Sequence, residues 1–223
     1  MTRKSDIAFV TFSNNRYAGV ETKLVESIKR FYPTADIFVY HSYSEIGCPP
    51  HETHPYGFKP YAIDHVKRKG YPIVFWCDSC IRLVKSIEPL IPEIAARGVF
   101  LQKDGWVTGQ WANDKSLKYF GVSRDEAMDI SAVYACIMAF DFRTTIAYRF
   151  LGKWKQACDE GIFRGAWKND TQSESEDTRC LGHRHDQTCA EIISHQLAIP
   201  RGYLIHSYDP NSTTRYFTGW NHP

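Results

Sequence analysis

Short apolar runs alternate with helical patterns along most of the chain. A run at 7–12 is followed by apolar residues three or four positions apart from Val20 to Phe31, and then by a second run at 36–41. This order predicts a strand, a helix and a parallel strand, the unit of right-handed crossovers. Further strands are predicted at 72–76, 99–102, 132–140 and 203–206, and further helices at 60–69, 87–95, 146–158 and 189–197.

The alternation predicts an α/β fold with a mostly parallel central sheet and helices on both faces. Such sheets bind ligands at the carboxyl ends of their strands.

Two stretches depart from the pattern. Residues 103–131 carry scattered aromatic residues without a clean period, which predicts a partly helical insertion that walls a cleft. Residues 169–178 contain no large apolar residue and predict a mobile loop.

Composition narrows the class of protein. The 223 residues are 43% hydrophobic and 14% aromatic, which favours one globular domain with stacking surfaces or a deep cleft. The net charge of +2 is too small for non-specific nucleic-acid binding, and no apolar stretch approaches the length of a membrane span. Seven cysteines, several within apolar runs, favour a reducing, cytoplasmic compartment. The last residues carry no obvious cap, which leaves open that the domain was excised from a longer protein.

Asp78 directly follows the apolar run at 73–76, so we expect it at the carboxyl end of a central strand. A carboxylate there suits a cation or a sugar, and Mg²⁺ or Mn²⁺ would add hard oxygen ligands from the phosphates of a bound molecule. The alternative is that Asp78 only caps the following turn. Lys59 precedes Pro60 at a predicted helix start, where an anion is favoured, although a solvated surface lysine fits equally well.

Two clusters later in the chain also carry candidate chemistry. Residues 182–187 place acid, base and amide groups at the start of the last helix, where Asp186 is either an active-site carboxylate held ionised by its basic neighbours or a helix cap. His206 ends the last predicted strand and is a candidate metal ligand or a core histidine. Cys77 and Cys80 have the spacing of a redox or zinc pair, which Cys180, His183 and His185 would complete.

The order of elements, with Phe-Trp-Cys-Asp at 75–78 and His-Arg-His-Asp-Gln at 183–187, resembles nucleotide-sugar glycosyltransferases of the GT-A fold. Within that fold the chain looks most similar to small enzymes that large algal DNA viruses encode for capsid glycans. The resemblance covers nearly the whole chain. It implies one Rossmann-like GT-A domain over 1–223, with a nucleotide-binding half at 1–102 and an acceptor and sugar half at 103–223.

The resemblance also implies an activity. A hexose or deoxyhexose would pass from a UDP-sugar to a glycan or glycoprotein acceptor, with retention of configuration and with Mn²⁺ or Mg²⁺ as cofactor. If the protein is viral, it would act in the host cytoplasm on a capsid glycan. Asp78 takes the first position of a DxD-like motif, but Cys80 stands where the second Asp belongs, which weakens the expected metal site.

Site residues follow from the matched motifs. The nucleotide-binding residues would be Thr11, Phe12, Ser13, Asn14, Tyr17, Lys59, Trp76 and Asp78. Asp78 and His206 would hold the metal, Asp186 and Gln187 would be catalytic, and Asp104, Trp106 and His185 would contact the sugar or the acceptor. Two other classes stay open: a zinc or thiol module on Cys77 and Cys80, and a non-catalytic carbohydrate-binding domain that uses Trp106 and Trp111.

Overall fold

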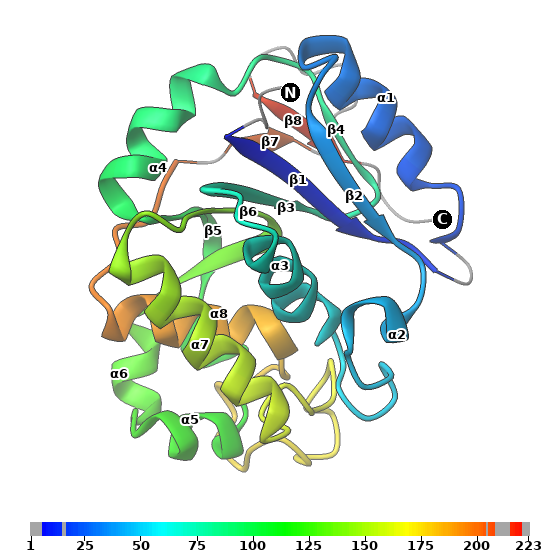
Figure 1. Cartoon of the computed structure of the whole chain (residues 1–223). Helices are drawn as coiled ribbons and strands as arrows, with labels where there is room; N and C mark the ends of the chain where they lie inside the picture. Colours follow the sequence, from blue (N-terminus) through cyan, green and yellow to red (C-terminus); the bar gives the residue numbers. More distant parts are fainter. Residues whose placement is uncertain (1–5, 15–16, 204, 208–214, 220–223) are drawn as a thin grey trace.

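A five-stranded sheet forms the centre of the computed structural model, which describes residues 6–14, 17–203, 205–207 and 215–219 (Figure 1). Its strands, in spatial order, are β2 (Asp36–Tyr40), β1 (Ile7–Phe12), β3 (Ile73–Cys77), β6 (Ser131–Asp141) and β5 (Val99–Val107). β1 is parallel to β2 and β3, whereas β6 is antiparallel to both β3 and β5. Four strands therefore share one direction, and the prediction of an α/β fold with a mostly parallel sheet is confirmed.

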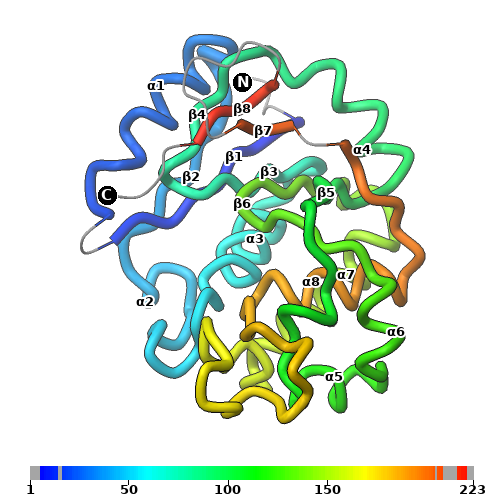
Figure 2. Tube along the Cα trace, turned by 180° about the vertical axis from the view of Figure 1, so that it is seen from behind, coloured from blue at the N-terminus to red at the C-terminus, as the bar shows by residue number. Residues whose placement is uncertain are grey.

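Helices cover both faces of this sheet, as predicted (Figures 1 and 2). One face carries α3 (Phe58–Arg68), α7 (Thr145–Asp159) and α8 (His185–Gln196). The opposite face carries α1 (Glu21–Phe31) and α4 (Ile91–Arg97). Shorter helices complete the chain: α2 (Tyr43–Ile46), η2 (Glu88–Leu90), η3 (Thr108–Gln110), α5 (Asp114–Phe120) and α6 (Arg124–Met128).

Alternating side chains of each central strand supply two separate apolar cores. In β1, Val10 and Phe12 pack towards α3 and α7, while Phe9 packs towards α1. In β3, Trp76 joins the first core and Phe75 the second. Because both faces are covered, these strands read as continuous apolar runs, which is why the sequence predicts them.

The last predicted strand, at 203–206, is the main error in the element assignment. β7 covers only His206–Ser207 and joins a separate three-stranded sheet with β4 (Ile81–Leu83) and β8 (Phe217–Gly219); Leu204 lies outside the described residues. The backbone N–H of Ile205 donates to the side-chain oxygen of Gln102 at 3.1 Å instead of to a neighbouring strand. The carbonyl of Ile205 accepts from the backbone N–H of Phe217 in β8 at 3.0 Å, so this segment joins the small sheet and not the central one.

The two irregular stretches of the sequence have different outcomes. Residues 103–107 extend β5, beyond a register shift, and η3, α5 and α6 follow, so the partly helical character is confirmed. Residues 169–178 form neither helix nor strand, as expected for a loop. The side chain of Asn169 accepts from the backbone of Glu174 and donates to that of Ser175, which ties the loop to itself.

None of the helices in the described part of the chain combines the length and the apolar character that a membrane span requires. None of the seven cysteines forms a disulfide bond in the described part of the chain. The cytoplasmic location and the division into halves at residue 102 stay predictions.

Candidate functional site

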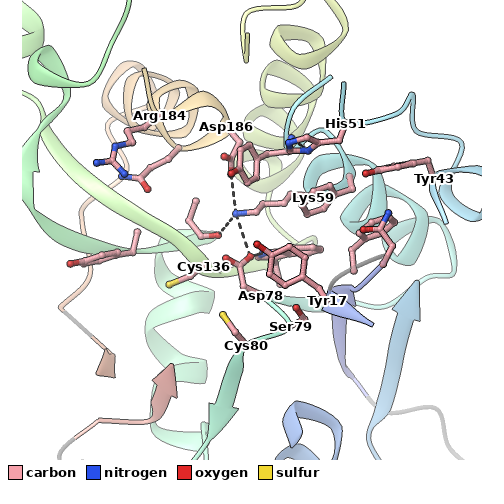
Figure 3. A pocket seen from close by; sticks show the side chains of 18 of the residues that line it. Tyr17, Tyr43, His51, Lys59, Asp78, Ser79, Cys80, Cys136, Arg184 and Asp186 are labelled. Atoms are coloured by element: carbon pink, nitrogen blue, oxygen red, sulfur yellow. Dashed lines mark hydrogen bonds and ion pairs between the residues drawn. The ribbon is translucent and has the colours of Figure 1, made fainter. Parts of the chain in front are cut away.

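A pocket of about 610 Å³ opens where β1 and β3 end, at the sheet edge that the sequence predicts (Figure 3). Because β6 runs antiparallel to β3, its amino-terminal half reaches the same edge, and the backbone N–H of Asp78 donates to the carbonyl of Cys136 at 2.8 Å. The predicted residues that line the pocket are Phe12, Asn14, Tyr17, Lys59, Trp76, Asp78, Cys80, Asp186 and Gln187.

Lys59, in the first turn of α3, is the centre of this pocket. Its ammonium lies 3.3 Å from Oδ1 of Asp78 and 3.1 Å from Oδ2 of Asp186, and it donates to the carbonyl of Ala135 at 3.1 Å. The side chain is 6% exposed, so the alternative of a solvated surface lysine is wrong. Burial alone lowers the pKa of Lys59, but the two carboxylates outweigh burial and raise the pKa above its usual value.

Asp78 presents a carboxylate to the pocket. The indole N–H of Trp76 donates to its Oδ1 at 2.8 Å, next to the ammonium of Lys59. Burial raises the pKa of Asp78, while Lys59 and the indole counteract this shift. The side chain bonds to the indole of Trp76 and faces the ammonium of Lys59, which favours a role in the pocket over the turn-cap alternative.

Asp186 faces Lys59 from the first turn of α8. The N-cap of that helix is Arg184, so the cap alternative for Asp186 is wrong. The histidines beside Asp186 do not supply the positive charge that the sequence predicts, because burial lowers the pKa of His183 to about 3 and also lowers that of His185. Lys59 is therefore the positive charge that faces Asp186. Gln187 lines the pocket and donates from its amide to Glu191 at 3.1 Å.

Besides His206, five predicted site residues do not line the pocket. Thr11 is fully buried, and Ser13 donates to the carboxylate of Glu21 at 2.6 Å. His185 is buried with its Nδ1 2.8 Å from a backbone carbonyl. Asp104 is buried and Trp106 is half exposed, and the lining includes no residue of 103–131. This stretch therefore does not wall the pocket itself, where β6, α8 and Trp167 lie instead, but its Trp111 contacts the lining residue Arg184.

The predicted metal pair does not come together as a protein cluster. His206 is 1% exposed, its Nδ1 lies 2.9 Å from Oε1 of Gln102, and burial lowers its pKa to about 4. The described residues contain no group of three or more histidine, cysteine, aspartate or glutamate side chains that could hold a metal. Burial raises the pKa of the Cys80 thiol to about 12, so the thiol is protonated and a poor ligand for a hard cation. Asp78 remains as a carboxylate that fits Mg²⁺ or Mn²⁺ when ligand phosphates supply the other oxygens.

The zinc or thiol module has no site in the described part of the chain. Cys77 is fully buried in the core, and the thiol of Cys180 lies 3.5 Å from the carbonyl of Ala112. Burial raises the pKa of both thiols, whereas redox and zinc chemistry use thiolates.

Sequence reasoning missed most of the aromatic lining. Phe12 stacks on Phe58 with ring centres 4.7 Å apart and on Tyr43 at 5.1 Å, and together these rings wall the end of the pocket next to β1. The other lining residues are His51, Glu52, Tyr56, Ser79, Tyr134, Ala135, Cys136, Trp167 and Arg184. Of these, Arg184 lies in the cluster at 182–187 that the sequence predicts. The segment 47–57, rich in proline, glycine and histidine directly before Lys59, was the available signal for His51, Glu52 and Tyr56.

No protein-family model and no curated protein matches the chain. Among solved structures, the apo form of the bifunctional glycosyltransferase WbbM is similar with a TM-score of 0.55 and 11% identity, over 100% of this chain and 47% of that one. A glycosyltransferase involved in glycosylation of the major capsid of PBCV-1 is similar with a TM-score of 0.52 and 10% identity, over 96% and 91% of the two chains. The chain has the GT-A fold of glycosyltransferases.

Apo mouse xyloside xylosyltransferase 1 shares this GT-A fold as well, with a TM-score of 0.51 and 10% identity over 97% of this chain and 98% of that one. The chain spans about half the length of WbbM, at 47%. Identities of 10–11% relate these proteins by fold, so activity, donor and acceptor have to be argued from the pocket.

Proposed function

We propose that this GT-A domain is a glycosyltransferase that moves a hexose or deoxyhexose from a UDP-sugar to a glycan or glycoprotein acceptor. The observation that carries the proposal is the buried ammonium of Lys59 between the carboxylates of Asp78 and Asp186. This charged group lies inside a pocket at the sheet edge where α/β folds bind ligands.

The donor would lie with its base at the β1 end and its sugar near α8. Phe12, Tyr43 and Phe58 offer stacked rings for a flat base, and Asn14 and Tyr17 offer polar groups beside them. Lys59, Asp78 and Asp186 together carry one net negative charge, which would repel a diphosphate. This charge balance supports Mg²⁺ or Mn²⁺ on Asp78, where the cation would neutralise the departing diphosphate.

Transfer breaks the bond between the anomeric carbon and the diphosphate oxygen. The acceptor oxygen bonds to that carbon, and the departing diphosphate takes up the hydroxyl proton. The sugar gains positive charge in the transition state, so the carboxylate of Asp186 would stabilise it while Lys59 keeps that carboxylate in place. We propose retention of configuration from the family resemblance, which the anomeric configuration of the product tests by NMR.

A capsid glycan as acceptor is the narrowest form of the proposal. It comes from the resemblance to viral enzymes, and the mouse enzyme with the same fold has a nearly equal TM-score. The fold therefore gives no preference between viral and other acceptors.

The test measures release of UDP from a panel of UDP-sugars by the wild type and by Asp186→Asn. We expect turnover to fall about 100-fold or more with UDP affinity nearly unchanged, because the carboxylate acts mainly in the transition state. Turnover within a few-fold of wild type would remove Asp186 from the mechanism. Saccharide binding without any hydrolysis or transfer would favour the non-catalytic carbohydrate-binding alternative.

A further inference from the structure

An arginine held between two tryptophans stands at one end of the pocket. The guanidinium carbon of Arg184 lies 3.9 Å from the ring centre of Trp111 and 4.7 Å from that of Trp167. Trp106 meets Trp111 edge-on with ring centres 5.9 Å apart. Trp106 and Trp167 are 51% and 47% exposed, so large aromatic surfaces next to Arg184 face solvent.

The stack orients the guanidinium without using its hydrogen-bond donors. The backbone N–H of Arg184 donates to Thr188 at 3.2 Å, but its side chain makes no hydrogen bond with any residue that the structure describes. Burial lowers the pKa of Arg184, and the charge of nearby Asp104 counteracts this. The guanidinium carbon lies over both indole rings, and an arginine held over aromatic rings can still donate from its N–H groups. Such a group binds a carboxylate or a phosphate with two parallel hydrogen bonds.

Arg184 is the positive charge of the pocket that the protein itself does not use. Among the described lining residues, Lys59 and Arg184 carry a permanent positive charge, and Lys59 is shared by two carboxylates. Figure 3 shows Arg184 on one side of Lys59 and Tyr43 on the other. Because Tyr43 stacks on Phe12 at the proposed base end, Arg184 lies at the end away from the base.

We infer that the acceptor is an acidic glycan whose carboxylate or phosphate group binds Arg184 between Trp111 and Trp167. The exposed indoles of Trp106 and Trp167 would pack against the apolar faces of its sugar rings. This inference rests on the proposed glycosyltransferase function, and it adds the chemical class of the acceptor.

The test compares binding of methyl glucuronide, methyl glucoside 6-phosphate and methyl glucoside by saturation-transfer NMR, in the presence of UDP. The proteins are wild type, Arg184→Gln, Arg184→Lys and the control Arg149→Gln, which removes an exposed charge of α7. We expect the wild type to bind at least one acidic sugar about tenfold more tightly than the neutral one. Arg184→Gln should abolish this preference, Arg184→Lys should keep part of it, and Arg149→Gln should keep all of it. The two acidic sugars distinguish a carboxylate from a phosphate.

Three results would overturn the inference. One is equal binding of neutral and acidic sugars by the wild type. Another is a loss of affinity for UDP but not for uridine in Arg184→Gln, which would place the donor diphosphate on Arg184. The third is a preference for UDP-glucuronic acid over UDP-glucose that disappears in Arg184→Gln, which would make the donor sugar the acidic partner. If the wild type binds neither UDP nor any UDP-sugar, the proposed function is contradicted instead. Binding of the acceptor sugars is measured separately from binding of UDP, so the two failures can be distinguished.

Discussion

Lys59 is a buried cation whose stability in the fold depends on two partners that come from distant parts of the sequence. Removing one charge of a buried group commonly costs several kcal/mol, because the remaining charge loses its compensation. Lys59 retains a carboxylate when either Asp78 or Asp186 is changed alone. We therefore expect variants with a single substitution at Asp78 or Asp186 to remain folded, so that a change in their activity can be assigned to the reaction and not to unfolding.

At the residue scale, Asp78→Asn should leave the protein folded and reduce donor hydrolysis about 100-fold or more. Asparagine keeps the shape and can still accept from the indole of Trp76, but it removes the charge that would hold a cation. The measurement is turnover together with the melting temperature on one preparation. Cys80→Ser is the matched control from the same loop and should stay within about threefold of wild type. Activity of Asp78→Asn near the wild-type level would show that Asp78 is not part of the site.

At the scale of elements, the contact between α8 and β6 contains a fully buried carboxyl group. Oε1 of Glu191 accepts from the backbone N–H of Val133 and from Gln187, both at 3.1 Å, while Oε2 has no partner among the described residues. Burial raises the pKa of Glu191 to about 7, and the hydrogen bonds and the charge of Arg201 only partly oppose this. Below about pH 7 the protonated form of Glu191 is therefore favoured, next to the catalytic candidate Gln187.

This pKa predicts how the stability of the protein depends on pH. The usual pKa of 4.5 applies to Glu191 in the unfolded chain, so between about pH 4.5 and 7 the folded state holds a proton that the unfolded state has released. Stability contributed by this group should therefore fall as the pH rises through that window, by roughly 3 kcal/mol in total. Urea unfolding at pH 5 and pH 8 measures the difference. Glu191→Gln should lose this part of the pH dependence, and an unchanged dependence would contradict the assignment.

A second element-scale prediction concerns the packing of the segment that carries Trp167 against the entry to α8. A Cβ atom at Gly182 would collide with the carbonyl oxygen of Trp167, and the backbone N–H of His183 donates to Ala166 at 2.8 Å. Gly182→Ala should push Trp167 away from Arg184, cost about 1–3 kcal/mol of stability and reduce transfer to the acceptor more than UDP affinity.

Gly152→Ala is the control for this glycine substitution. Gly152 lies within α7, and the space that its Cβ would occupy is open, so alanine there should stabilise the protein by up to about 1 kcal/mol. Melting temperatures and transfer rates of both variants are the measurement. Normal transfer by Gly182→Ala would show that the position of Trp167 does not matter for the acceptor.

At the scale of the whole molecule, the pocket is assembled from both halves of the chain. β1, α3 and β3 come from the first half, and β6, Trp167 and the start of α8 from the second. A ligand that bridges these parts binds the folded state and not the unfolded chain, so it must raise the stability of the entire domain.

UDP at a hundred times its dissociation constant should stabilise the protein by about 2.7 kcal/mol. For a chain of this size the melting temperature should rise by about 5–10 °C. The scan uses UDP with Mg²⁺, with Mn²⁺ and with a chelator, and guanosine diphosphate as the control nucleotide. We expect the larger shift with a divalent cation and the loss of that gain in Asp78→Asn. A flat response to every nucleotide with metal present would contradict the donor proposal.

The sequence alone determined the elements and the edge of the sheet at which the pocket lies. Helical spacing and continuous apolar runs are local properties, so α3, α7 and the strands β1 to β3 could be predicted from neighbouring residues. The position of Asp78 at the end of an apolar strand follows from the same local pattern. The resemblance added the GT-A fold, because its motifs lie at the ends of these elements.

Only the tertiary structure decided which side chains meet. The sequence allowed Lys59 to be either a surface lysine or a pocket residue. The strand order and the antiparallel course of β6 place it between Asp78 and Asp186. His206 lies near the predicted edge in the sequence, yet its ring bonds to Gln102. A side chain's partners depend on contacts between residues far apart in the chain, and local periodicity carries no information about such contacts.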